Sequence, residues 1–173
     1  HSMTRAEFIY IMTRSQNGDK KALGQIYEEY FGKLCVTAFN IVKNTDAAYD
    51  IASNVILKLI EFKHDVSEIH NHVGYLITMT RNEAKNFIVK QNREISVSEI
   101  WDTESKELPD MLWLEDIYAV LTNEERELFL LHNVWDMTLH KTANCLGITY
   151  GAVKARYAII KKKIKAIYEK GRK

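Results

Sequence analysis

The chain has 173 residues, 46% of them hydrophobic, and its 24 basic side chains nearly balance 23 acidic ones. The apolar content is sufficient for a buried core and excludes a disordered chain, while seven glycines and one proline argue against a turn-rich β fold, so we expect an all-α protein. No apolar run reaches the roughly 20 residues of a membrane span and no signal peptide is recognisable, so we expect a cytoplasmic protein without membrane insertion.

Four helices are predicted in the first half of the chain. Apolar residues at helical spacing indicate a short helix over residues 4–15 and a long amphipathic one over residues 20–42. A third helix follows the break at residues 43–46, and a fourth, with Ile88 among its core residues, runs over residues 72–92.

The second half begins after a segment without periodicity. Residues 94–109 are acidic and contain the only proline, which predicts a linker between a domain over residues 4–93 and one over residues 110–170. A short helix is expected over residues 111–121, and the capping box that starts at Thr122 predicts another.

The end of the chain has the pattern of a helix-turn-helix. A helix over residues 138–146, a stop at Gly147 and a longer basic helix over residues 149–169 follow one another. Gly147 is expected to take a positive φ, and Ala143 is small where the two helices cross. The buried stripe of the second helix is predicted to consist of Val153, Ile160, Ile164 and Ile167.

Charge is distributed unevenly along the chain. Residues 95–127 hold two basic and ten acidic side chains, whereas residues 128–173 hold ten basic and two acidic ones. A basic helix-turn-helix suits the major groove of duplex DNA, where the start of the second helix faces the bases and lysines neutralise phosphates. The candidate contacts are Thr149, Tyr150, Gly151, Lys154, Ala155, Arg156 and Lys161, with Arg156 as the preferred base contact.

Several segments together resemble the extracytoplasmic-function (ECF) sigma factors of bacterial RNA polymerase. Residues 146–156, LGITYGAVKAR, are similar to the family's L-G-I-S-x-G-T-V-K-S-R. Residues 124–131, EERELFLL, resemble the family's R-E-V-F-L-L run. Residues 26–30, IYEEY, and residues 75–82, YLITMTRN, resemble the family's L-Y-E-R-Y and W-L-Y-R-I-A-R-N. The resemblance covers nearly the whole chain, in the same order.

The resemblance implies a transcription initiation factor that joins core RNA polymerase, directs it to promoter DNA and assists promoter melting. Its second domain would read the minus-thirty-five element, and its first would bind the polymerase clamp and the melted minus-ten element. Aromatic and polar or cationic groups suit a single strand, and the candidates are Tyr75, Arg81, Asn82, Lys85, Asn86 and Lys90. Where the family's clamp-binding helix reads A-E-D-L-V-Q-E-V-F, this chain has AYDIASNVI, which places Asp50, Ser53 and Asn54 at the polymerase surface. An anti-sigma protein is a further expected partner.

The sequence is also compatible with two other functions. A polymerase-independent helix-turn-helix regulator, dimerised through its first domain, would also use the basic end of the chain, and a protein-interaction module is a third possibility. No phosphate-binding loop, nucleophile arrangement or metal-ligand spacing is present, so we expect no enzymatic activity, cofactor or metal. The histidines are expected to face solvent, and Cys35 and Cys145 to be buried thiols.

Overall fold

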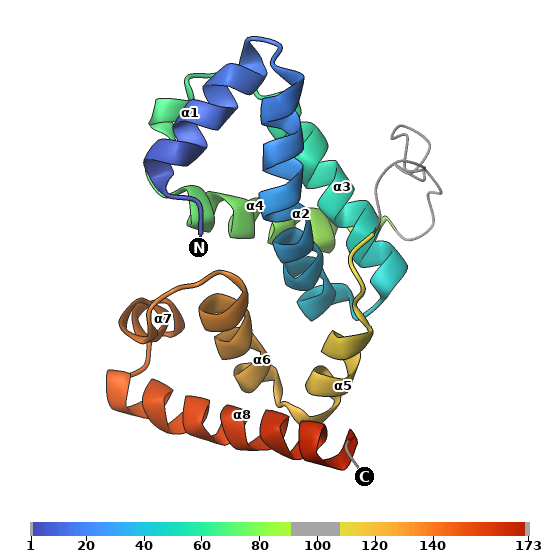
Figure 1. Cartoon of the computed structure of the whole chain (residues 1–173), viewed down its shortest axis with the longest axis vertical. Coiled ribbons are helices and arrows are strands. Elements are labelled where there is room, and N and C mark those ends of the chain that lie inside the picture. Colours follow the sequence, from blue (N-terminus) through green and yellow to red (C-terminus); the bar gives the residue numbers. More distant parts are fainter. Residues whose placement is uncertain (1, 91–107, 172–173) are drawn as a thin grey trace. The chain divides into compact units, whose positions relative to one another are not determined.

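The computed structural model describes residues 2–90 and 108–171, and its contacts divide the chain into two compact units. Unit 1 comprises His1–Leu108 and unit 2 comprises Pro109–Lys173. All regular secondary structure in the described residues is helical (Figure 1), which confirms the all-α prediction. Most of the predicted linker, residues 94–109, lies outside the described residues.

The described residues of unit 1 form four α-helices and one short 3-10 helix. They are α1 (Arg5–Gln16), α2 (Lys20–Val42), α3 (Thr45–Ile60), η1 (Val66–Glu68) and α4 (His72–Val89). Each α-helix begins at a polar cap whose side chain accepts hydrogen bonds from the first turn, namely Thr4, Asp19, Asn44 and Asn71. Asn44 lies within the break at residues 43–46, where one helix was predicted to end and the next to begin.

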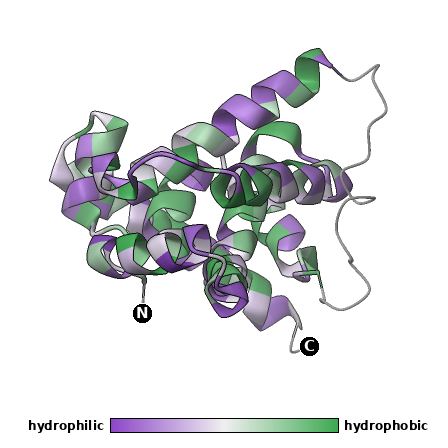
Figure 2. Ribbon diagram, turned by 90° about the horizontal axis from the view of Figure 1, so that it is seen from above, coloured by the Kyte–Doolittle hydropathy of each residue, from purple (hydrophilic) through white to green (hydrophobic). Residues whose placement is uncertain are grey.

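The core of unit 1 is built around α2. This helix packs against α1, α3 and α4, so its middle is buried on almost every side, from Tyr30 to Phe39. Helices coloured by hydropathy alternate between hydrophobic and hydrophilic segments (Figure 2), as amphipathic helices do. One core prediction is wrong at the end of α4, because Ile88 is 46% exposed, and the neighbouring Val89 is 84% exposed.

Unit 2 places a long helix against three shorter ones. Its helices are α5 (Leu112–Val120), α6 (Asn123–Phe129), a π-helical segment η4 (Leu130–Val134), α7 (Leu139–Leu146) and α8 (Tyr150–Gly171). α8 packs against α5, α6 and α7 around a core that includes Leu114, Leu128, Leu130, Val153 and Ile160. The predicted stripe on α8 is correct at Val153 and Ile160, while Ile164 and Ile167 are only half-buried.

Some predictions of side-chain burial are wrong, because contacts between helices affect burial as well as the apolar pattern within a helix. His72 is buried, since its ring stacks on Phe8 of α1 at a centroid distance of 5.1 Å. His132 is half-buried and donates through Nδ1 to the Met137 carbonyl oxygen at 2.7 Å. Cys35 is buried as predicted, whereas Cys145 is exposed.

Candidate nucleic-acid interface

A tight turn joins α7 to α8. Gly147 has a φ of 68°, and the Ile148 amide donates back to the Ala143 carbonyl at 3.1 Å, which closes the end of α7. The Thr149 hydroxyl accepts a hydrogen bond from the Ala152 amide at 3.1 Å and so caps α8. Ala143 is 2% exposed. The positive φ of Gly147 is confirmed, and Ala143 is buried where the sequence predicted a close crossing.

The exposed side of α8 carries most of the predicted duplex-DNA contacts. By the 3.6-residue repeat, Gly151 and Ala155 lie opposite to the fully buried Val153 and Ile160, while Tyr150, Lys154 and Lys161 lie together along one edge of the exposed side. The exposed contacts are Thr149, Tyr150, Gly151, Lys154, Ala155 and Lys161. Arg156 does not share their face, because it is half-buried and flanks the buried stripe.

The first turn of α8 makes a ring contact that the sequence pattern does not reveal. The rings of Tyr150 and His140, the latter from α7, are stacked with centroids 3.7 Å apart and planes at 12°. The Lys154 amine lies 5.2 Å from the centroid of the same tyrosine ring. His140 is exposed as predicted, but it belongs to the same surface as two of the candidate contacts.

The lysines further along α8 have different surroundings. Lys163 forms an ion pair with Glu125 of α6 at 2.6 Å, and Glu125 is only 7% exposed. Burial tends to raise the pKa of Glu125, but hydrogen bonds from Lys163 and from the Thr122 amide outweigh it and lower that pKa. Lys163 thus ties α8 to the capping box of α6, while Lys161 and Lys162 remain exposed.

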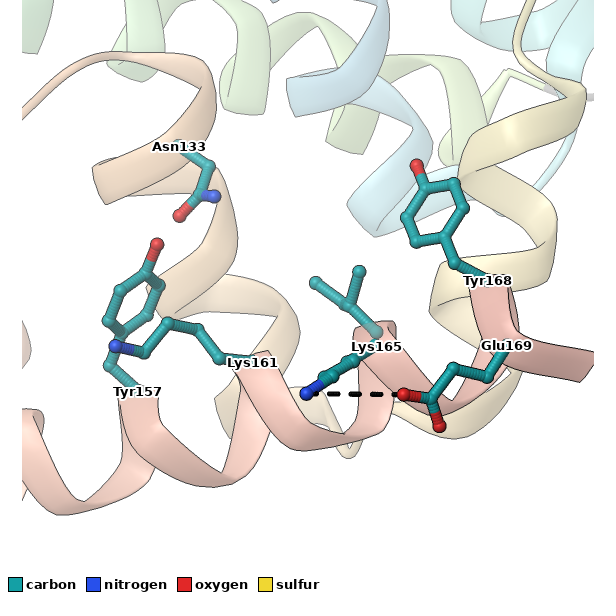
Figure 3. A pocket seen from close by; sticks show the side chains of 7 residues that line it. Asn133, Tyr157, Lys161, Lys165, Tyr168 and Glu169 are labelled. Carbon is teal, nitrogen blue, oxygen red and sulfur yellow. Dashed lines mark ion pairs between the residues drawn. The ribbon is translucent and has the colours of Figure 1, made fainter.

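A groove of about 440 Å³ follows the second half of α8 (Figure 3). The Tyr157 hydroxyl points toward Asn133 of η4, and Lys165 pairs with Glu169 at 3.9 Å. Lys161 stands at its edge with its amine 5.2 Å from the Tyr157 ring centroid. Among the predicted DNA contacts, Lys161 is therefore the one that borders this groove.

In unit 1, the exposed side of α4 gathers most of the candidates for the melted strand. Tyr75, Asn82, Lys85 and Asn86 recur on one side of the helix, opposite to the buried Leu76, Thr80 and Ala84. Arg81 is half-buried at the flank, and Lys90 follows the last turn as the C-cap. The sequence reading missed Val89, which lies on this same side and is highly exposed.

The segment before α4 is held by both ends of α1. Arg5 donates to the carbonyl oxygens of Ile69 at 3.0 Å and Ser67 at 2.9 Å. Gln16 donates to those of Phe62 at 3.0 Å and His64 at 2.9 Å. Phe62 contacts Tyr75 edge-to-face with centroids 6.3 Å apart, so the fixed segment also supports an aromatic ring of the α4 face.

The outward side of α3 carries the three predicted polymerase contacts. Asp50, Ser53 and Asn54 are all half-buried on that side. Burial, together with the neighbouring carboxylate of Asp46, raises the pKa of Asp50. Tyr49 stacks on Phe31 of α2 with centroids 6.5 Å apart, so an aromatic side chain borders the acidic one.

In the part of the chain that the structure describes, no cluster of three or more histidine, cysteine or carboxylate side chains is arranged to hold a metal ion. None of the helices within residues 2–90 and 108–171 combines the length and the apolar character needed to cross a membrane.

Comparison with known proteins identifies the fold. No protein-family profile matches the chain, and no curated protein matches its sequence significantly. The sigma factor RpoE of Bartonella quintana, solved with the anti-sigma factor NepR, is similar in structure over 86% of this chain and 98% of its own, with a TM-score of 0.50 and 19% identity. The chain has the sigma-factor fold. CnrH, solved with the cytosolic domain of CnrY, covers 93% of this chain and 96% of its own at a TM-score of 0.48 and 16% identity.

The sigma-factor fold agrees with the resemblance found in the sequence. The similarity to RpoE extends over most of both chains, so it includes elements on both sides of the undescribed segment. At this level of sequence identity the agreement concerns the fold, and the roles of individual side chains rest on the surfaces described above.

Proposed function

We propose that the chain is a sigma factor that joins bacterial core RNA polymerase, directs it to specific promoters and assists their melting. The observation that carries the proposal is the exposed, cationic first half of α8, which follows a helix-turn-helix turn in a chain with the sigma-factor fold. In such a motif the start of the second helix enters the major groove. Lys154 and the residues beside it would then read the upstream promoter element.

The proposal assigns the downstream element to the exposed side of α4. Melting a promoter leaves unstacked bases, which bind to aromatic and cationic groups. Tyr75 supplies a half-exposed ring, Lys85 an exposed amine, and Asn82 and Asn86 amides that bond base edges. Arg81 and Lys90, at the flank and end of this face, would contact phosphates.

The outward side of α3 is proposed to contact polymerase through Asp50, Ser53 and Asn54. An acidic and polar surface suits a basic partner, since complementary charge favours association. RpoE was solved with an anti-sigma factor, so we include an anti-sigma protein among the proposed partners. The chain would act in the cytoplasm with polymerase and have no catalytic activity or cofactor of its own.

The test is co-purification with bacterial core polymerase, followed by run-off transcription from a library of promoter fragments. Association with defined start sites is expected for the unaltered chain. Lys154→Gln should lower promoter-specific transcription about tenfold without changing core binding, because it removes a charge from the first half of α8 only. Lys170→Gln, an exposed lysine at the other end of α8, is the matched control and should change neither quantity.

Two outcomes would contradict the proposal. Absence of binding to core polymerase, with duplex DNA binding retained, would favour a regulator that acts without polymerase, and its preference for symmetric half-sites would then be measured. Equal effects of Lys154→Gln and Lys170→Gln would show that overall charge, rather than the first half of α8, controls promoter use.

A further inference from the structure

The stack of His140 on Tyr150 joins the two helices of the motif at their exposed surface. His140 is the second residue of α7 and Tyr150 is the first of α8, so the stack spans the turn at Gly147. The rings lie nearly parallel, with centroids 3.7 Å apart and planes at 12°. Both residues are exposed, and Tyr150 retains 38% of its accessible surface.

The two helices do not depend on this stack for their packing. Thr142 and Ala143 of α7 and Val153 of α8 are at most 2% exposed, and the two helices pack against one another. The turn is closed by the hydrogen bond from the Ile148 amide to the Ala143 carbonyl. A surface ring contact beside a complete core adds little to stability, so its role lies in what it does to the surface.

The effect on the surface is to fix a large side chain before anything binds. A free tyrosine at the first position of a helix can turn between rotamers. The ring of Tyr150 is instead covered by His140 and approached by the Lys154 amine at 5.2 Å from its centroid. Its hydroxyl and that amine are therefore presented together, beside Gly151, whose lack of a side chain leaves the helix surface open.

We infer that His140 is a positioning residue, which holds Tyr150 and Lys154 in the arrangement that binds promoter duplex. The inference rests on the proposed function and adds to it a residue from α7. Ordering one long side chain on binding costs affinity, and a side chain that is ordered in advance avoids this cost. His140 thus acts on DNA through Tyr150, by ring contact rather than by charge.

A direct contact of His140 with DNA phosphate would give a different experimental result. If His140 contacted a phosphate directly as a cation, the aromatic ring of Tyr150 would be irrelevant to its effect. His140→Phe separates the two roles, because phenylalanine keeps a ring to stack on Tyr150 and carries no charge. The double variant with Tyr150→Ala separates them again, since a positioning residue has nothing left to position.

The experiment measures promoter-duplex affinity of the polymerase complex at fixed salt for His140→Ala, His140→Phe, Tyr150→Ala and the double variant His140→Ala/Tyr150→Ala. His140→Ala should weaken binding about three- to tenfold, the cost of ordering one side chain, and His140→Phe should stay within about twofold of the unaltered chain. In the Tyr150→Ala background, His140→Ala should have no further effect. Thermal unfolding should be unchanged in every variant, because both residues are exposed.

Other results would disprove either the positioning role of His140 or the proposed function. Equal losses for His140→Ala and His140→Phe, or an unchanged cost of His140→Ala in the Tyr150→Ala background, would disprove the positioning role while leaving the proposed function intact. Failure of the unaltered chain to form any promoter-specific complex with polymerase would overturn the proposed function and this inference with it.

Discussion

At the scale of single residues, the contacts that matter most in this protein join side chains of different helices. His72 of α4 stacks on Phe8 of α1 and donates through Nε2 to the Met3 carbonyl oxygen at 3.0 Å. Burial, aided by nearby Arg5 and Lys33, lowers the pKa of His72 in spite of that hydrogen bond. The neutral ring is therefore part of the folded structure of unit 1.

This lowered pKa predicts a loss of stability in mild acid. The unfolded chain binds a proton at His72 near the ordinary pKa of about 6.5, before the folded chain does, so the free energy of unfolding falls as the pH drops below that value. The urea midpoint of the unaltered chain should fall further between pH 7.5 and 5.5 than that of His72→Gln. The control is His70→Gln, an exposed histidine two positions away, which should keep the full pH dependence. Identical pH dependence in all three chains would refute the assignment.

Because Lys163 forms an ion pair with Glu125, we expect replacement of Lys163 to lower stability more than replacement of its neighbour Lys162. Lys163→Met leaves the buried Glu125 carboxylate without its partner and should lower the free energy of unfolding of unit 2 by about 1–2 kcal/mol, toward the low end for charged hydrogen bonds because Lys163 is partly exposed. Lys162→Met changes an exposed lysine and should have no measurable effect. Urea unfolding followed by tryptophan fluorescence checks both, and equal losses would show that Lys163 behaves as a surface lysine.

At the scale of elements, α1 acts as a brace for the segment between α3 and α4. Its first and last residues, Arg5 and Gln16, donate to four carbonyl oxygens of residues 62–69. Because that segment leads into α4, its backbone position sets where the exposed face of α4 begins. Helix α1 is thereby connected to candidate contacts that lie far from it in the sequence.

If α1 holds the segment before α4, removing the hydrogen bonds at one end of α1 should loosen that segment locally. Gln16→Leu eliminates two side-chain donors and should speed hydrogen exchange in residues 61–71 about fivefold, the equivalent of about 1 kcal/mol in local opening. Exchange in the buried middle of α2 should remain slow. Thr13→Val, which removes an exposed hydroxyl of the same helix that bonds only within α1, is the control. Similar exchange in both variants would argue against the brace.

The helices were predictable from sequence because their signals are local. Caps such as Thr122 and stops such as Gly147 act within one turn, and the apolar repeats that surround them bury one side of each helix. The same repeat also predicted the exposed face of α8.

The π-helical turn of η4 and the stack of His140 on Tyr150 could not be predicted from the sequence, since each depends on how one helix meets another. Arg156, the preferred base contact by motif, lies three residues after Val153 and four before Ile160, so the same repeat already places it beside the buried stripe.

At the scale of the whole molecule, the distribution of charge is as informative as the fold. The sequence is nearly neutral, yet residues 95–127 carry eight net negative charges and residues 128–173 eight net positive ones. Acidic side chains that precede unit 2 directly along the chain repel the DNA that the basic face of α8 would attract. Under the proposed function, DNA affinity would therefore depend on acidic residues outside the helix-turn-helix.

We therefore expect the effect of removing acidic side chains on duplex affinity to depend on where in the chain they lie. Replacing Glu99, Glu104 and Glu107 with glutamine in the full chain should tighten duplex binding about two- to fivefold at 0.05 M salt, an effect that shrinks as added salt shortens the screening length to about 8 Å and below. The same three-charge change at the exposed Glu28, Glu61 and Glu68 of unit 1 alters net charge equally and should have a smaller effect. Fluorescence anisotropy of a labelled duplex measures both chains across a salt series. If the two triple variants bind DNA equally well at every salt concentration, net charge alone determines affinity and the position of the acidic segment is irrelevant to it.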